Sequence, residues 1–254
     1  ACTAYEGLSV FSPSLVYDNT ASATISILSA SIRHRVKRFI FCSSMARYGD
    51  ANGKIFTEDM VPKPQDPYGI AKVSSEQVIK NLAQVHGLEF VILVPHNIIG
   101  PRQKFDDPYR NVASIMINRM LRGLPPIIYG DGMQTRSFSF VNDVVNPMYI
   151  SATSKQVVGE VINVGPDGNE ITILELSKIL GRLLNVKLEP LFYRDRPQEV
   201  KHAVCSADKA RSLLNYEAKT PIEDGLIEMI NYIKSVGPKE FDYAHRIEID
   251  NELT

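Results

Sequence analysis

Two stretches in the first half of the chain carry apolar residues at the spacing of an α-helix. They cover residues 19–36 and 68–86, and Gly87 follows the second. Apolar side chains that recur every three or four positions form one stripe along a helix, and glycine commonly ends one. The sequence therefore predicts two amphipathic helices. Their apolar stripes consist of Ile25, Leu28 and Ile32 in the first, and Ile79, Leu82 and Val85 in the second.

A short apolar run of strand type follows each helix. The first lies within residues 37–44, and the second, Phe90–Val94, is apolar at every position. A strand without polar alternation is typical of a parallel sheet that is covered on both faces. The order helix, strand, helix, strand predicts an α/β fold with a parallel sheet.

The second half alternates shorter elements. We expect strands at residues 126–129 and 161–164 and a helix at residues 111–122. Two further helices are expected to begin at capping boxes, in which a Thr and a Glu three residues later satisfy each other's backbone N–H groups. The two halves of the chain interleave, so the pattern indicates no linker between them. The two boxes are Thr172 with Glu175, and Thr220 with Glu223.

Composition narrows the class of protein. The chain has 254 residues, with 28 Lys and Arg against 29 Asp and Glu. A net charge of −1 offers no electrostatic basis for a nucleic-acid partner. Apolar runs are too short to span a bilayer and no signal peptide is recognisable, so no membrane partner is expected. Three cysteines do not form a disulfide framework, which favours a reducing, cytoplasmic location.

Tyr68 and Lys72 are the first candidate catalytic residues. Their spacing places both side chains on one helix face, where an ammonium lowers the pKa of a phenol and makes it a usable general base. Ser44 follows the first predicted strand, and ligands of open α/β sheets bind at the carboxyl ends of strands. Each feature also has an ordinary structural explanation: a solvated helix face for the Tyr–Lys pair, and a turn cap for Ser44.

Polar residues also follow the second predicted strand. His96 and Asn97 lie at its carboxyl end, whereas the other histidines are scattered without the spacing of metal ligands, so no metal site is expected. Arg136 and Arg196 lie in loops shaped by glycine and proline, where two guanidinium groups could clamp a diphosphate. Either arginine could equally pair with a nearby acid at the surface.

Four segments together resemble the extended short-chain dehydrogenase/reductase family, and within it the UDP-glucose 4-epimerases and related NAD-dependent nucleotide-sugar epimerases. The resemblance runs to about Tyr232. It implies a Rossmann-type NAD-binding domain in residues 1–105, a smaller nucleotide-sugar lobe in 106–254, and a homodimer through helices 21–33 and 73–86. The segments are FIFCSSMARYG (39–49), DPYGIAK (66–72), PHNIIGPRQ (95–103) and GDGMQTR (130–136).

The resemblance also implies roles for single residues. Tyr68 would take the proton of the sugar 4-hydroxyl, Lys72 would bind the nicotinamide ribose and lower the tyrosine pKa, and Ser44 would orient the hydroxyl. The implied reaction epimerises a UDP-hexose at C4 through a transient 4-keto sugar, with hydride carried by NAD. The other NAD contacts implied are Asn19, Ser43, Pro95 and His96. The other substrate contacts implied are Asn97, Asn111, Arg136, Arg196, Glu199 and Ala203.

Departures from the family pattern refine this hypothesis. The family's 4,6-dehydratases carry an Asp–Glu pair directly after the strand-end hydroxyl residue, where this chain has Met45 and Ala46. Water elimination is therefore not expected; a 2-epimerase or a reductase stays the alternative enzyme. Arg47 stands where the family has an aliphatic residue. Ala203 lies where side-chain size tunes the acceptance of N-acetyl sugars, and its small size favours an N-acetyl group.

The family binds NAD through a glycine-rich loop, and these 254 residues contain no such motif. The resemblance begins after the family's fourth strand. At about 30 residues per βαβ unit, roughly 80 residues are missing. We therefore expect a fragment of a complete epimerase that lacks the first strands of the sheet. The alternative is a truncated, catalytically inactive binding module.

Overall fold

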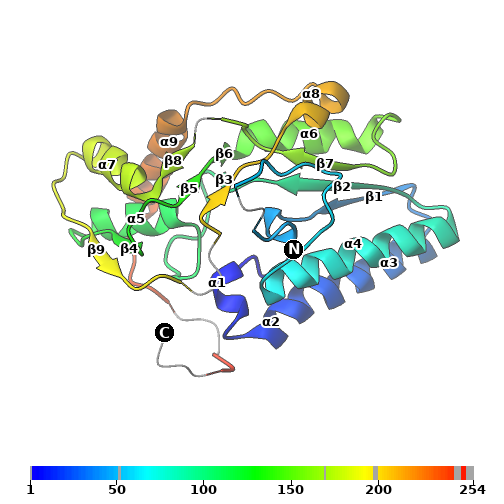
Figure 1. Ribbon diagram of the computed structural model, residues 1–254, viewed down its shortest axis with the longest axis horizontal. Coiled ribbons are helices and arrows are strands. Elements are labelled where there is room, and N and C mark those ends of the chain that lie inside the picture. Colours follow the sequence, from blue (N-terminus) through cyan, green and yellow to red (C-terminus); the bar gives the residue numbers. More distant parts are fainter. Residues whose placement is uncertain (1, 51–52, 169, 197–199, 243–246, 250–254) are drawn as a thin grey trace.

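The computed structural model describes residues 2–50, 53–168, 170–196, 200–242 and 247–249. A parallel sheet occupies one half of the molecule, with strands in the order β1-β2-β7 (Figure 1). These strands are β1 (Arg38–Cys42), β2 (Glu89–Pro95) and β7 (Val161–Val164). Cys42 lies opposite Leu93, which in turn lies opposite Ile162. The predicted α/β fold with a parallel sheet is confirmed.

Helices cover both faces of this sheet (Figure 1). On one face lie α3 (Ala23–Arg33) and α4 (Pro67–His86), and on the other α6 (Val141–Thr153) and α8 (Asp208–Leu214). Side chains of β2 alternate between two hydrophobic cores. Ile92 and Val94 pack with the α3–α4 core, and Val91 and Leu93 pack with the α6–α8 core. This double burial explains why the strand is apolar at every position.

The first long helix begins earlier than the apolar spacing indicates. Helical backbone starts at α2 (Pro13–Tyr17), continues through a π-helical turn, η1 (Asp18–Ser22), and runs on into α3. Proline is well suited to the first turn of a helix, since its fixed φ is helical and no N–H is needed there. The expected start at residue 19 was therefore six residues late. A single turn, α1 (Glu6–Ser9), precedes α2.

The other half of the molecule is a helical lobe with short strands (Figure 1). Its hydrophobic core is shared by α5 (Val112–Leu121), α7 (Ile173–Leu184) and α9 (Ile222–Val236). The short strands pair in three small sheets. They are β3 (Ile98–Ile99) with β6 (Ser139–Phe140), β4 (Ile127–Tyr129) with β9 (Leu191–Tyr193), and β5 (Thr135–Arg136) between β8 (Ile171–Thr172) and β10 (His202–Ala203).

One of the two predicted capping boxes is confirmed and the other is wrong. At the start of α7, Thr172 and Glu175 satisfy each other's backbone N–H groups. At the start of α9 the N-cap residue is Pro221, without a side-chain cap. Thr220 donates from its backbone N and its hydroxyl to the Asp143 carboxylate instead, at 3.0 and 3.3 Å. A distant carboxylate has replaced the local partner.

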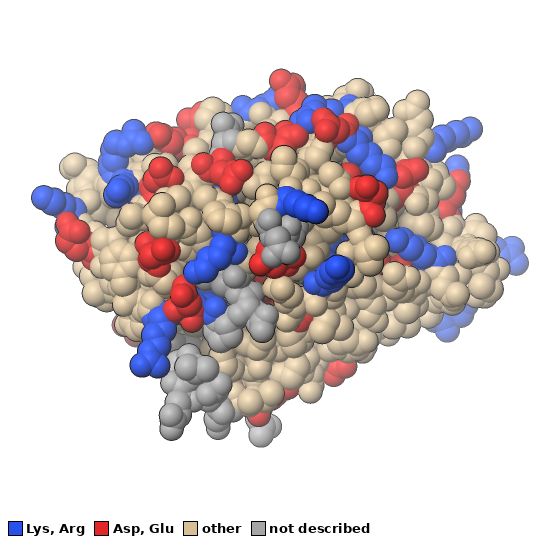
Figure 2. Space-filling view, viewed as in Figure 1, with Lys and Arg blue, Asp and Glu red and all other residues tan. Residues whose placement is uncertain are grey.

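Charged side chains of both signs are interspersed on the face that Figure 2 displays, without a broad region of one sign. Among the helices of the described ranges, none combines the length and the apolar character that crossing a bilayer requires. The same part of the chain contains no cluster of His, Cys, Asp or Glu side chains suited to a metal ion.

Candidate active site

Ser44, Tyr68 and Lys72 meet at the carboxyl end of β1. Ser44 follows the strand and caps the 3₁₀ turn η2 (Met45–Arg47), where its Oγ accepts from Ala46 N at 3.2 Å. Tyr68 is the second residue of α4, and its hydroxyl shares a hydrogen bond with the Ser44 side chain. Lys72, one turn later, lies with Nζ 5.7 Å from the centre of the Tyr68 ring.

The start of α4 is fixed against η2 by close backbone contact. The Asp66 carboxylate caps the helix by accepting from Gly69 N at 2.9 Å. A Cβ atom at Gly69 would lie 2.7 Å from the Ala46 carbonyl oxygen, closer than side chains come in practice. Glycine at this position therefore lets the turn that carries Ser44 approach the turn that carries Tyr68.

The pKa of Tyr68 is not lowered in this structure, and the expected lowering by Lys72 stays a prediction. Burial raises the pKa of the Tyr68 phenol above its ordinary value, and the hydrogen bond with Ser44 opposes that shift only in part. The Lys72 ammonium lies 5.7 Å from the centre of the ring and donates to the Cys42 carbonyl oxygen at 2.7 Å. Tyr68 is therefore a neutral phenol near pH 7 in this state.

The residues expected to contact NAD have other partners here. The Asn19 amide donates to Thr3 Oγ1 at 2.9 Å, and Ser43 Oγ donates to the Glu76 carboxylate. Pro95 ends β2. The His96 ring is fully buried, with Nε2 3.0 Å from the Ala203 carbonyl oxygen. Their cofactor roles stay predictions.

The described residues expected to contact substrate lie around the second lobe. Asn97 has a positive φ of 33° and donates to the Ser137 carbonyl oxygen at 3.1 Å, and Asn111 caps α5. Ala203 on β10 pairs with Arg136 on β5. The Arg196 guanidinium lies 4.0 Å from the centre of the Tyr129 ring. Glu199 lies outside the described residues, and these substrate roles stay predictions.

Sequence reasoning missed a buried ion pair beside the candidate catalytic residues. Arg47, in η2, pairs with Glu76, in α4. One member of this pair could have been found from the sequence, because Glu76 follows Lys72 by four residues and therefore lies on the same helix face. The identity of the partner could not be read, because Arg47 is 29 residues away.

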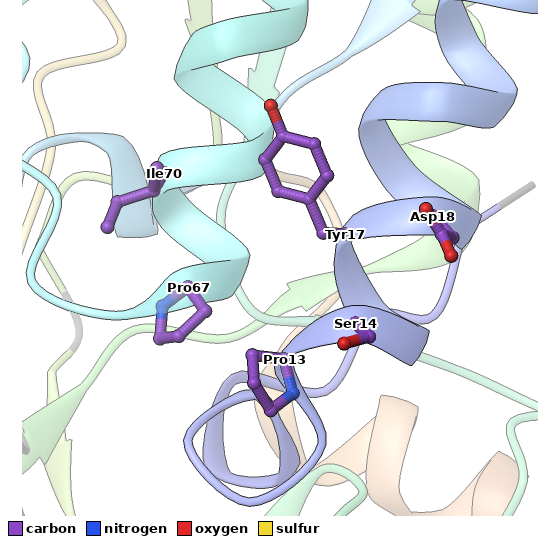
Figure 3. Close-up of a pocket in the computed structure, with 6 residues that line it drawn as sticks. All are labelled: Pro13, Ser14, Tyr17, Asp18, Pro67 and Ile70. Carbon is purple, nitrogen blue, oxygen red and sulfur yellow. The ribbon is translucent and has the colours of Figure 1, made fainter. Parts of the chain in front are cut away.

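A shallow pocket lies on the exposed side of α4 (Figure 3). It lies between α2 and the start of α4, and Ile70 borders it at 49% exposure. Tyr68 and Lys72 point to the opposite, buried side of the helix at 8% and 3% exposure. The pocket is therefore distinct from the Ser–Tyr–Lys group. Its lining residues are Pro13, Ser14, Tyr17, Asp18, Pro67 and Ile70.

A Ser at the carboxyl end of a parallel strand, beside a Tyr and a Lys on a neighbouring helix, is the residue set of the short-chain dehydrogenase/reductase class. Within that class, this chain belongs to the NAD-dependent epimerase/dehydratase family, whose model matches residues 1–165. The match confirms the family that the four sequence segments indicated. Because this family is NAD dependent, it also confirms the expected cofactor.

Relatives place the chain among enzymes of nucleotide sugars. The UDP-glucose 4-epimerase of Thermotoga maritima, solved with UDP-glucose, is 32% identical with a TM-score of 0.85, over 93% of this chain and 76% of that one. The UDP-N-acetylglucosamine 4-epimerase of Methanobrevibacter ruminantium is 29% identical with a TM-score of 0.86, over the same shares of both chains. A dTDP-glucose 4,6-dehydratase of Neisseria meningitidis is 31% identical over 80% of this chain and 59% of its own length.

Proposed function

We propose that this protein epimerises a nucleotide sugar at C4, with a UDP-hexose as substrate and NAD as cofactor. The observation that carries the proposal is the meeting of Ser44, Tyr68 and Lys72 at the carboxyl end of β1, in a member of an NAD-dependent family. A hydroxyl, a phenol and an ammonium within one group provide a hydrogen-bond donor, a proton acceptor and a fixed positive charge. Removal of a sugar hydroxyl proton needs all three.

The turn that follows Ser44 favours epimerisation over dehydration. Elimination of water from a sugar needs an acid that protonates the leaving hydroxyl and a base that removes the neighbouring proton. The first two residues of η2 are Met45 and Ala46, so neither position supplies a carboxylate. The chain thus has the residues for proton transfer at one sugar hydroxyl. In this turn it lacks an acid that could protonate a second, leaving hydroxyl.

The donor set at this edge of the sheet fits the nicotinamide ribose of NAD. The Lys72 ammonium has three N–H groups, one of which donates to the Cys42 carbonyl, and the Ser44 and Tyr68 hydroxyls lie beside it. When bound, NAD supplies the hydride acceptor and donor that inversion at a sugar carbon requires. Lys72 would hold a ribose hydroxyl and Ser44 would orient the sugar 4-hydroxyl toward Tyr68.

Tyr68 performs the proton transfer in this proposal. Its phenolic oxygen accepts the proton from the sugar 4-hydroxyl and returns it after the sugar has turned over. Because burial raises the pKa of this phenol, the positive charge of Lys72 has to act through proximity to the ring rather than through a direct hydrogen bond in the state described. Deprotonation therefore depends on rearrangement of the Lys72 contact when cofactor and substrate bind.

The proposal includes a homodimer formed through residues 21–33 and 73–86. The first segment comprises the end of η1 and all of α3, and the second lies in α4. The two helices α3 and α4 lie side by side (Figure 1), and both expose apolar side chains. Ile27 is 53% exposed and Val85 66% exposed. Sedimentation or light scattering tests this part, and a monomer at micromolar concentration contradicts it.

The proposed reaction is tested by incubating the protein, as purified from its native source, with NAD and UDP-glucose that carries deuterium at C4. We expect UDP-galactose in which the label stays at C4, because one hydride leaves and returns within the same site. Nuclear magnetic resonance identifies the inverted carbon, and mass spectrometry follows the label. Inversion at C2, or a product lighter by water or carbon dioxide, contradicts C4 epimerisation.

Ala203→Tyr is expected to reduce the kcat/KM for UDP-N-acetylglucosamine by about tenfold or more, with little effect on UDP-glucose. Ala203 pairs with Arg136 between β10 and β5, and a phenol ring is far larger than its methyl side chain. Ala203→Ser is the matched control, because it adds one atom. Equal losses for both sugars contradict a role for this position in accepting the N-acetyl group.

A further inference from the structure

A buried ion pair occupies the same face of α4 as the proposed catalytic residues. Arg47 Nε donates to Glu76 Oε1 at 2.9 Å, and Arg47 Nη2 donates to Glu76 Oε2 at 3.0 Å. The Arg47 side chain is 2% exposed and that of Glu76 is fully buried. Ser43 Oγ donates to Glu76 Oε1 as well. Both carboxylate oxygens of Glu76 are therefore occupied.

Glu76 is the carboxylate that Lys72 would otherwise meet on this helix face. Tyr68, Lys72 and Glu76 follow one another at intervals of four residues in α4, and all three are buried. Residues four apart on a helix are neighbours, with Cβ atoms about 5–6 Å apart. A buried carboxylate without a partner strongly attracts the nearest ammonium, because burial removes the competing water.

Lys72 nevertheless has a hydrogen-bond partner other than Glu76. Its Nζ donates to the Cys42 carbonyl oxygen at 2.7 Å and lies 4.9 Å from the centre of the Phe41 ring. These contacts direct the ammonium toward the carboxyl end of β1 and the Tyr68 ring. Arg47 neutralises the Glu76 carboxylate while Lys72 keeps this orientation.

We propose that Arg47 is a positioning residue: its bidentate pair with Glu76 keeps the carboxylate from capturing Lys72, so that the ammonium stays beside Tyr68. This inference rests on the proposed function and names a residue that controls the same site. Arg47 itself need not touch substrate or cofactor. It acts from η2, the turn that begins at Ser44, and so also ties that turn to the helix carrying Tyr68.

The decisive comparison is Arg47→Val against the double variant Arg47→Val/Glu76→Gln. In the single variant, Glu76 is left charged and Lys72 is expected to turn toward it. A displacement of this kind lowers kcat by about 10²-fold, whereas the KM for the sugar nucleotide changes little. In the double variant, the neutral amide still accepts from Ser43 but no longer attracts Lys72. We expect kcat to recover most of the loss.

Crystal structures of both variants provide a readout that does not depend on turnover. We expect Lys72 Nζ within hydrogen-bond distance of Glu76 in Arg47→Val, and on the Cys42 carbonyl in the double variant. If the unaltered chain shows no epimerase activity, the proposed function fails, yet these structures still decide the position of Lys72. Lys72 remaining on Cys42 in Arg47→Val overturns the inference.

Two further variants separate positioning from general stability. Arg47→Lys keeps the positive charge and is expected to keep Lys72 on Cys42, which provides an answer even if Arg47→Val does not fold. Arg38→Val removes an ion pair with Glu89 of 2.7 Å at the opposite end of β1. It is expected to lower stability without changing kcat. An equal loss of kcat in Arg38→Val and Arg47→Val overturns the positioning role.

Discussion

Tyr68→Phe is expected to lower kcat by about 10²- to 10⁴-fold, the usual contribution of a positioned general base. The substitution removes only the phenolic oxygen, so the buried ring keeps its packing and its contact with the Lys72 ammonium. Steady-state kinetics with UDP-glucose measure the effect on kcat, and equilibrium titration measures binding of the sugar nucleotide. Binding should change by less than the rate does, because the lost group acts on a proton in transit.

The dependence of this rate on pH has a definite sign. The base must be deprotonated, and burial raises its pKa, so turnover by the unaltered chain should rise as the pH rises above neutrality. Where deprotonation of Tyr68 limits the rate, the slope is about tenfold per pH unit. Tyr68→Phe should flatten this limb. A limb that survives in the variant assigns the titration to another group.

Tyr216→Phe is the matched control for this experiment. Tyr216 is also buried, and within the described residues its hydroxyl has no hydrogen-bond partner. Removing that oxygen should leave kcat and the fold unchanged. A Tyr216→Phe variant as slow as Tyr68→Phe contradicts a specific role for the Tyr68 phenol.

The parts of the fold that could be predicted are those with strong local patterns. The continuous apolar run of β2 predicted a strand that is buried on both faces, because no other arrangement covers side chains on alternate sides. The ends of α4 follow from single residues: Asp66 caps the first turn, and Gly87 leaves the helix with a φ of +68°. The two-residue strands, such as β3 and β5, are too short to have a period and were not predicted.

The sequence predicted which residues come together in the candidate site. It did not predict the pKa of Tyr68 or the contacts of Lys72. The Tyr68–Lys72 spacing placed both residues on one helix face, and Ser44 at the strand end brought the third. The pKa of Tyr68, however, depends on how deeply the ring is buried and on which acceptor Lys72 chooses. The contact of Lys72 with the Cys42 carbonyl and the pairing of Arg47 with Glu76 cannot be read from local sequence, because tertiary packing brings these groups together.

Acidification from about pH 7 to pH 5 is expected to remove about 2 kcal/mol of folding stability through His96 alone. Burial lowers the pKa of His96 from 6.5 to about 4 in the folded chain, because the ring is fully enclosed. Between these values the unfolded chain binds a proton at this side chain and the folded chain does not. Stability from the neutral ring is therefore complete above pH 6.5 and is lost as the pH falls toward 4.

The contacts of the His96 ring show why its protonation is unfavourable and which contact protonation would change. Nε2 donates to the Ala203 carbonyl oxygen at 3.0 Å, which leaves Nδ1 to accept from the Cys205 thiol at 3.5 Å. Protonating Nδ1 would place two donors opposite each other, since burial raises the pKa of Cys205 to about 12 and keeps its proton in place. Protonation therefore weakens the contact of His96 with Cys205, whereas Nε2 still donates to the Ala203 carbonyl oxygen.

Urea denaturation of the unaltered chain and of His96→Phe at the two pH values measures this linkage. His96→Phe fills a similar volume and cannot titrate, so it should lose about 2 kcal/mol less than the unaltered chain on acidification, whatever its stability at pH 7. His202→Gln is the control for the loss of a histidine, because His202 is exposed. Equal losses in the unaltered chain and in His96→Phe contradict the assignment. They would place the acid sensitivity in the carboxylates instead.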